Sequence, residues 1–163
     1  MDAIQLIKSD HVKVKGLFQE WMMAPSAQPE RKRAVAEKII QELMVHERIE
    51  EEIFYPAFKQ ALGEKGREEV EHSKKEHATV DSLIEELETM DVDAPDFEAT
   101  MMELKEKLEH HIKDEEEKML PLAQTWMQPQ LAQLGKDMLE YKQALTTQVK
   151  PKPLQDGQRQ QRQ

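Results

Sequence analysis

Residues 46–56 read HERIEEEIFYP, and residues 111–121 read HIKDEEEKMLP. Both stretches follow the pattern His-x3-Glu-Glu-Glu-x3-Pro, and one lies 65 positions after the other. A His and a Glu that are four residues apart project from the same face of a helix, one turn from each other. Each stretch therefore predicts a helix that presents an imidazole and a carboxylate side by side.

A second pair of segments repeats in the same way. Residues 10–20 and residues 76–86 share the spacing acid-His-x2-Val-x2-Leu-x2-Glu. The chain thus contains two copies of a helical hairpin, and each copy carries one single His and one His-x3-Glu pair. Two such copies packed about a pseudo-two-fold axis form a near-symmetric dinuclear centre, which is the design of di-iron four-helix bundles.

The composition and the breaks predict an all-α fold. The chain is rich in good helix formers and has only 5 Gly in 163 residues. Gly and Pro cluster in four places, and these breaks separate helices expected at about 2–24, 30–61, 67–90, 95–127 and 130–147. Short connections favour an antiparallel up-down-up-down four-helix bundle over residues 1–128. A C-terminal helix over 129–149, which either packs on the bundle or forms a dimer contact, and a disordered tail over 150–163 complete the expected organisation.

Six polar residues interrupt the apolar stripes that should face the core of this bundle. They are His11, His46, Glu50, His77, His111 and Glu115. A buried charge costs several kcal/mol unless it is paired or bound to a metal. The number of residues between each histidine and the nearest break in its hairpin is similar. The four histidines should therefore lie at the same height along the bundle, to within about one helical turn. We therefore expect these six side chains to form a metal site, whereas His72 and His110 fall off the stripes and belong on the surface.

The types of ligand restrict the metal. The chain has no Cys, which excludes thiolate ligands and disulfides. Imidazole and carboxylate together suit iron, manganese or zinc. Four His and two Glu are more than one tetrahedral zinc requires, so the set favours two metal ions that share the carboxylates.

Charge and hydropathy exclude other classes of function. The net charge of −10 argues against a nucleic-acid partner and against binding to an anionic membrane. No apolar run approaches the roughly 20 residues of a membrane span. The first residues lack the layout of a secretory signal, so we expect a cytoplasmic protein.

Through these motifs, residues 2–127 resemble the hemerythrin-like (HHE cation-binding) family. The resemblance rests on Asp10-His11, on residues 46–56, on Glu76-His77 and on residues 111–121. It implies an oxo- or hydroxo-bridged pair of iron ions, ferrous or ferric, in preference to manganese or zinc. It also implies that the four stripe histidines are terminal ligands and that the two stripe glutamates bridge the metals.

The chain departs from the classical oxygen-carrying members of that family. They carry a further His on the third helix, where this chain has Ser73, and a His-x4-Asp pair on the fourth, where Glu116 stands at the x4 position. Some relatives use the Glu directly after the second-helix His, which is Glu47 here. Glu47, Ser73 and Glu116 are therefore candidate additional ligands or outer partners of the ligands. We interpret Tyr55 as a cap on the core and expect Pro56 to kink its helix.

Three functions agree with this reading. The leading hypothesis is a di-iron protein that binds dioxygen for storage, sensing or delivery. The first alternative is a di-iron enzyme that acts on peroxide, nitric oxide or ferrous iron, and the second is an iron storage or sensing protein. The sequence indicates no protein partner.

Overall fold

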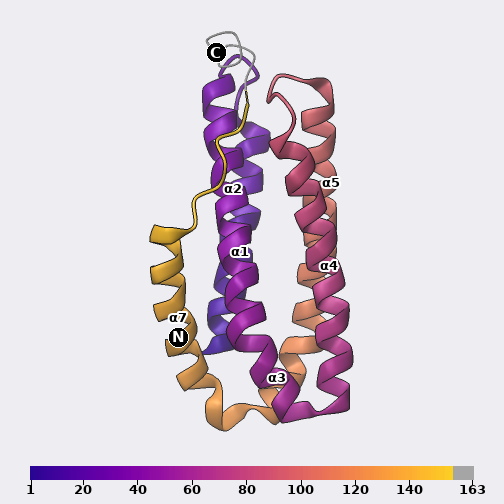
Figure 1. Cartoon of the computed structure of the whole chain (residues 1–163), viewed down its shortest axis with the longest axis vertical. Coiled ribbons are helices and arrows are strands. Elements are labelled where there is room, and N and C mark those ends of the chain that lie inside the picture. The colour runs from indigo at the N-terminus through magenta and orange to yellow at the C-terminus, as the bar shows by residue number, and fades with distance from the viewer. Residues whose placement is uncertain (156–163) are drawn as a thin grey trace.

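The computed structural model describes residues 1–155 and consists of helices joined by short turns (Figure 1). The elements are α1 (Ala3–Met23), α2 (Pro29–Ile49), η1 (Glu50–Phe54), α3 (Tyr55–Leu62), α4 (Glu64–Glu88), α5 (Pro95–Asp114), η2 (Glu115–Met119), α6 (Leu120–Trp126), η3 (Gln128–Gln130) and α7 (Leu131–Gln148). Here η1 and η2 are single π-helical turns and η3 is a 3₁₀ turn. Because α2, η1 and α3 continue into one another, as do α5, η2 and α6, four long helices form the predicted up-down-up-down bundle.

Local sequence explains where the helices begin. Asp2 caps α1, since its carboxylate accepts the N–H of Gln5 at 2.8 Å and the Gln5 side chain accepts the N–H of Asp2 at 2.9 Å. Gly63 has a φ of 64° and reverses the chain within one residue, so α4 begins at Glu64, three residues before the position expected from the sequence. Gly66, in the first turn of α4, lies close to the preceding helix α3. A Cβ at this position would come within 2.9 Å of the Phe58 carbonyl oxygen, so glycine fits where a larger residue would not.

The apolar core forms two clusters, one at each end of the bundle. The cluster near the α2 start includes Phe18, Ile39 and Leu87, and the cluster near α3 includes Ile7 and Phe54. On α1 and α4 the stripe histidine falls between the residues of one cluster and those of the other, and on the helix that continues α5 the stripe glutamate Glu115 does so. On α2 the change of cluster comes between Leu43 and Val45, just before His46. The polar layer is therefore closed from both ends by packed side chains.

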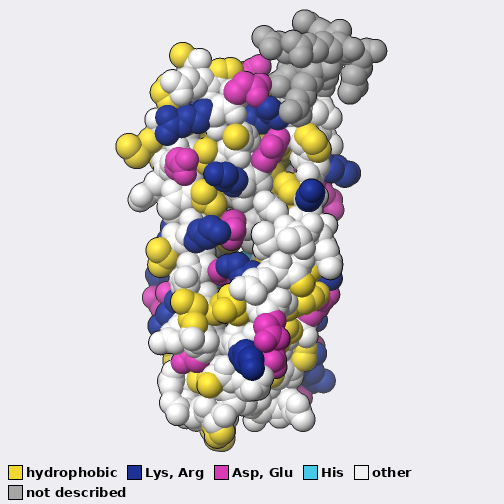
Figure 2. Space-filling view, turned by 90° about the vertical axis from the view of Figure 1, so that its left-hand side faces the viewer, with side chains coloured by type: hydrophobic (Ala, Val, Ile, Leu, Met, Phe, Trp, Pro, Cys, Tyr) yellow, Lys and Arg dark blue, Asp and Glu magenta, His cyan; other side chains and the backbone are white. Residues whose placement is uncertain are grey.

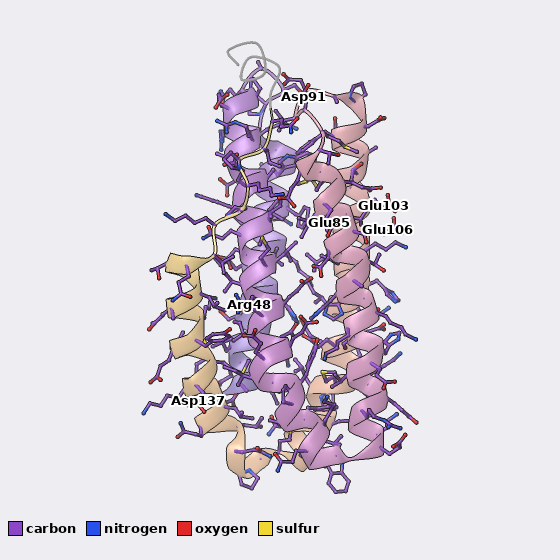
Figure 3. All side chains as sticks on the ribbon, in the orientation of Figure 1. Arg48, Glu85, Asp91, Glu103, Glu106 and Asp137 are labelled. Atoms are coloured by element: carbon purple, nitrogen blue, oxygen red, sulfur yellow. The ribbon has the colours of Figure 1, made fainter. Side chains whose placement is uncertain are left out.

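The C-terminal helix packs on the bundle and lies against α1 and α2 (Figure 1). Met138 is fully buried at this contact. Gly135 allows the close approach, because a Cβ there would lie 2.4 Å from the Met1 carbonyl oxygen. Arg48 lies between α2 and α7 and donates to the Tyr141 hydroxyl at 2.9 Å (Figure 3).

The segment after α7 differs from its prediction. Residues 150–155 run along the bundle instead of forming the start of a disordered tail, because Leu154 is fully buried in the cluster near the α2 start. The Leu154 N–H donates to Glu37 Oε1 at 3.0 Å, and the Val92 N–H donates to the Gln155 carbonyl at 2.9 Å. The rest of that prediction, over 156–163, lies outside the described residues.

The outer surface carries mixed charges. On the face that bears α7, basic and acidic side chains alternate, and neither sign forms an extended patch (Figure 2). Among residues 1–155, none of the helices has the length and hydrophobicity that a bilayer crossing requires.

Candidate metal centre

Both long helices that carry a His-x3-Glu pair widen at the glutamate. The N–H of Tyr55 bonds to the carbonyl of Glu50, and the N–H of Leu120 bonds to the carbonyl of Glu115. Such i→i−5 bonds define a π turn, which places one extra residue in the turn and is frequent at functional sites. A proline follows each turn, Pro56 in the first case and Pro121 in the second. Because proline has no backbone N–H, it leaves no unpaired donor where the regular hydrogen-bond pattern is interrupted. The irregularity thus comes before Pro56 and turns residue 55 toward the face of Glu50.

The structure brings together the six side chains that the sequence selected. All six are buried: His11, His46, Glu50, His77, His111 and Glu115. Their nitrogen and oxygen atoms form two groups that could each hold a cation, and within each group all atoms lie within 4.8 Å of one another. One group contains His11, His46, Glu50 and Glu115, and the other contains Glu50, His77 and His111. The shared Glu50 makes the two positions neighbours.

The two carboxylates lie between the imidazoles. Oε1 of Glu50 is 3.2 Å from Nε2 of both His46 and His77, which belong to different groups. Glu115 uses both oxygens, since Oε1 is 3.1 Å from Nε2 of His11 and Oε2 is 3.6 Å from Nε2 of His111. Each glutamate is therefore placed to contact both cation positions.

Atoms at the middle of the cluster lack hydrogen-bond partners. Among the described residues, these buried atoms include Nε2 of His11, Nε2 of His46, Oε2 of Glu50 and Oε1 of Glu115. Buried polar atoms in folded proteins are almost always satisfied by protein, water or an ion. Imidazole nitrogens and carboxylate oxygens that converge in a buried space are the types of ligand that a divalent transition-metal cation requires. The residues present thus fit the binding of metal.

Within each hairpin, an acidic residue holds the outer nitrogen of a histidine. Nδ1 of His46 lies 2.9 Å from Oδ2 of Asp10, and Nδ1 of His111 lies 2.9 Å from Oε1 of Glu76. Asp10 also pairs with Lys142 of α7. Carboxylates on the outer nitrogen fix the tautomer of a metal-binding imidazole, turn Nε2 toward the metal and raise the basicity of the ligand.

The other two histidines receive their carboxylates from the opposite hairpin. Nδ1 of His11 lies 2.7 Å from Oε2 of Glu116, and Nδ1 of His77 lies 3.4 Å from Oε1 of Glu51. Glu51 and Glu116 occupy the same position in the two repeats, directly after the stripe glutamate. All four imidazoles thus carry an acidic residue on the side away from the cluster.

Tyr55 points into the centre and does not merely cap the core. Its hydroxyl donates to Oε2 of Glu115 at 2.9 Å and lies 3.4 Å from Oε1 of Glu50. Its ring stacks on His77 with ring centroids 5.6 Å apart. Burial, together with the charges of Glu115 and Glu50, raises the pKa of Tyr55 well above its ordinary value, so the phenol keeps its proton. The second hairpin has Leu120 at the equivalent position and offers no such group.

The three additional candidates occupy different places. Glu116 contacts His11 at its outer nitrogen, and Ser73 is buried and hydrogen-bonds to Tyr55. Glu47 belongs to neither group of converging atoms. Burial and a hydrogen bond with Asp81 raise the pKa of Glu47 to about 10, which keeps it protonated.

In the absence of metal, protons balance the carboxylates. Burial lowers the pKa of His46, but Glu50 and Asp10 outweigh it and raise this pKa well above its ordinary value. Burial likewise opposes charge on Glu50, yet His46 and His77 hold the pKa of Glu50 well below its usual range. Binding of divalent cations must displace protons from the imidazoles, so it releases protons and strengthens as the pH rises.

The chain belongs to the hemerythrin HHE cation-binding domain family, whose sequence pattern residues 2–123 match. A crystal structure of an HHE cation-binding domain-containing protein from Mycobacterium kansasii superposes with a TM-score of 0.80 at 26% identity, covering 91% of this chain and 89% of that one. An uncharacterized hemerythrin-like protein of Schizosaccharomyces pombe is 33% identical over 84 residues, and a DNA nickase of Nostoc is 28% identical over 116. These regions are 52% and 71% of this chain but only 41% and 32% of the two curated relatives.

Proposed function

We propose that this protein holds two iron ions in the buried His/Glu cluster and binds dioxygen there. The observation that carries the proposal is the pair of overlapping atom groups that share Glu50. Six nitrogen- and oxygen-donor residues around two adjacent positions exceed the needs of one zinc and suit two ions with shared carboxylates. Iron in its ferrous form supplies the electrons that dioxygen binding requires.

The space beside the cluster limits the size of the ligand. A cavity of about 10 Å³ adjoins His11, His46 and His111, and its other lining residues are the acids Asp10 and Glu42 and the apolar Val14, Leu43, Leu108 and Ile112. A volume on the order of 10–15 Å³ holds one water-sized molecule. This cavity supports a diatomic or similarly small ligand, and the apolar part of its lining restricts the entry of water to the centre.

The protein's own residues orient the site. The acidic residues on the outer nitrogens keep His11, His46 and His111 turned inward. Glu50 and Glu115 would lie between the two cation positions, one regular helical turn after His46 and His111. The phenol of Tyr55 holds a proton 2.9 Å from Oε2 of Glu115, where it can donate a hydrogen bond within the centre.

That phenol favours one alternative, a di-iron enzyme that breaks down peroxide. Tyr55, which has Leu120 as its counterpart in the second hairpin, is a neutral proton donor beside Glu115 and His77, and general acid catalysis of O–O cleavage needs a proton at such a position. For either function, the net charge of −10 argues against a nucleic-acid partner and against an anionic membrane as partner. We propose the cytoplasm as the place of action because the first residues lack the layout of a secretory signal.

Metal analysis of the purified protein tests the proposal first. We expect about two iron ions per chain, and His46→Ala and His111→Ala should each lower the iron content and the melting temperature. His72→Ala is the control, because this exposed side chain lies outside the cluster and should leave the iron unchanged. A content of one zinc, or no metal, would overturn the di-iron assignment.

Anaerobic reduction followed by oxygen separates binding from turnover. A visible absorption band that appears with dioxygen and is reversed by flushing with argon supports reversible binding. Direct conversion to the oxidised centre, with turnover of added peroxide that Tyr55→Phe abolishes, overturns oxygen carriage in favour of the enzyme.

A further inference from the structure

A second cluster of histidines and acids lies on the outer face of α4 and α5. It consists of His72 and Glu76 on α4, and of His110 and Asp114 on α5. Each pair has the spacing His-x3-acid, which is also the spacing of the ligand pairs in the buried centre. Residues four apart share a helix face, and the neighbouring helices α4 and α5 bring the two pairs opposite each other.

Three of the four side chains, His72, Glu76 and Asp114, present ligand atoms that all lie within 4.8 Å of one another, and His110 adjoins the two carboxylates. Oδ2 of Asp114 lies 3.2 Å from Nε2 of His72 and 3.2 Å from Nε2 of His110. Oε2 of Glu76 lies 3.6 Å from Nε2 of His72 and 3.3 Å from Nε2 of His110. The same nitrogen of each imidazole thus faces the same two oxygens.

The arrangement differs from a common surface ion pair. The carboxylates form a floor that is 14% and 17% exposed, and the histidines form a rim that is 52% and 66% exposed. Without metal, the Nε2–H of His72 donates to Asp114 Oδ2 at 3.2 Å. A divalent cation can take the place of that proton, because deprotonated Nε2 and the carboxylate oxygens then all present lone pairs to it. The nearest lysine, Lys118, is 3.7 Å from the other oxygen of Asp114, so it does not fill the space between the histidines.

We propose that His72, Glu76 and Asp114 form a mononuclear site for a divalent transition-metal cation, with zinc as its best fit and His110 beside it as the fourth ligand after a change of rotamer. Imidazole and carboxylate ligands make a nitrogen and oxygen set that four-coordinate zinc accepts. The site opens to solvent, so a cation reaches it without any rearrangement of the bundle.

This surface site shares one side chain with the buried centre. Glu76 turns Oε2 toward His72 and His110, while its Oε1 lies 2.9 Å from Nδ1 of His111. A cation on the surface would therefore bind to the carboxylate that positions a histidine of the interior. The proposal concerns a site distinct from the di-iron centre and stands or falls independently of it.

Zinc titration of the iron-loaded full-length protein tests the surface site. Wild type should bind one Zn²⁺ per chain more than the double variant His72→Ala/His110→Ala, and each single variant should bind it at least tenfold more weakly. Glu76 is left unchanged because it also contacts His111. Iron is measured in the same samples, so a loss of the buried metal is seen separately.

The control is Glu106→Gln, which removes one charge from α5 four residues before His110. Glu106 projects away from the bundle (Figure 3) and should not alter zinc binding. Equal zinc binding by wild type and the double variant would overturn the proposal. So would an equal loss in Glu106→Gln, which would indicate binding by bulk charge, or iron release that matches zinc uptake.

Discussion

Glu116 offers a sharp test of how the outer carboxylates act on the metal centre. Its Oε2 lies 2.7 Å from Nδ1 of His11, the shortest of the four contacts between an acid and an outer nitrogen. Glu116→Gln keeps an oxygen acceptor of the same size at this place and removes only the charge. The variant therefore leaves the orientation of His11 intact and lowers the basicity of its Nε2.

The expected magnitude follows from the geometry. Loss of an outer partner of a metal ligand typically weakens metal binding 10- to 100-fold. Glu116 is 32% exposed, so solvent already screens part of its charge, and the amide still accepts the hydrogen bond. We therefore expect about a tenfold loss of affinity, which corresponds to about 1.4 kcal/mol. Glu51→Gln should cost less, because Glu51 lies 3.4 Å from Nδ1 of His77, which lacks a well-formed hydrogen bond.

The assay is an anaerobic competition for ferrous iron between the protein and a coloured chelator. Glu117→Gln serves as the matched control, since it removes the same charge from the next residue, which is exposed. Glu116→Gln should release iron at roughly tenfold lower chelator concentration than wild type. An equal effect of Glu117→Gln, or none from Glu116→Gln, would refute the argument that the contact with His11 matters.

Three further predictions concern stability. Tyr55→Phe removes the hydrogen bond to Glu115 and should destabilise the metal-free protein by about 1.5–3 kcal/mol in urea unfolding; an unchanged midpoint contradicts that contact. Burial lowers the pKa of His77, but the nearby carboxylates outweigh it and raise this pKa from 6.5 to about 10. In the metal-free protein the resulting stabilisation is therefore complete below about pH 6.5 and is lost as the pH rises through 10. The urea midpoint should fall over that range in wild type and fall less in His77→Gln, which keeps only the contribution of His46. Gly135→Ala should lower the melting temperature through about 1–3 kcal/mol of overpacking against the N-terminal backbone, whereas Gly16→Ala, whose Cβ meets nothing within 4 Å, should raise it.

The repeated spacings in the sequence were sufficient to predict the bundle and to select the residues that converge. Helical periodicity puts residues four apart on one face, and that rule holds for His46 and Glu50 because the helix between them is regular. It fails one turn later. At about 100° per residue, Tyr55 would point well away from the face of Glu50, and only the π turn brings its hydroxyl to the carboxylates.

The surface cluster around His72 and the burial of Leu154 were not predicted, because both depend on contacts between segments that are far apart in the sequence or on different helices of one hairpin. The position of His72 off the apolar stripe indicated only a surface residue, whereas the structure sets it near His110 on the next helix, with Asp114 between them. The spacing His-x3-acid occurs in His72/Glu76 and in His110/Asp114, and this was the sequence feature that could have pointed to the surface cluster. Leu154 is one apolar residue in a polar segment, and its burial depends on a space left between other helices, which no local pattern describes.

The exchange of carboxylates between the hairpins has a consequence for assembly. Glu51 of the first hairpin holds His77 of the second, and Glu116 of the second holds His11 of the first. Each half therefore supplies the carboxylate beside the single histidine of the other. If the cluster holds metal as proposed, fragments cut at the connection between Glu88 and Pro95 should reassociate more tightly with metal than without it, because ligands from both hairpins would bind the same ions.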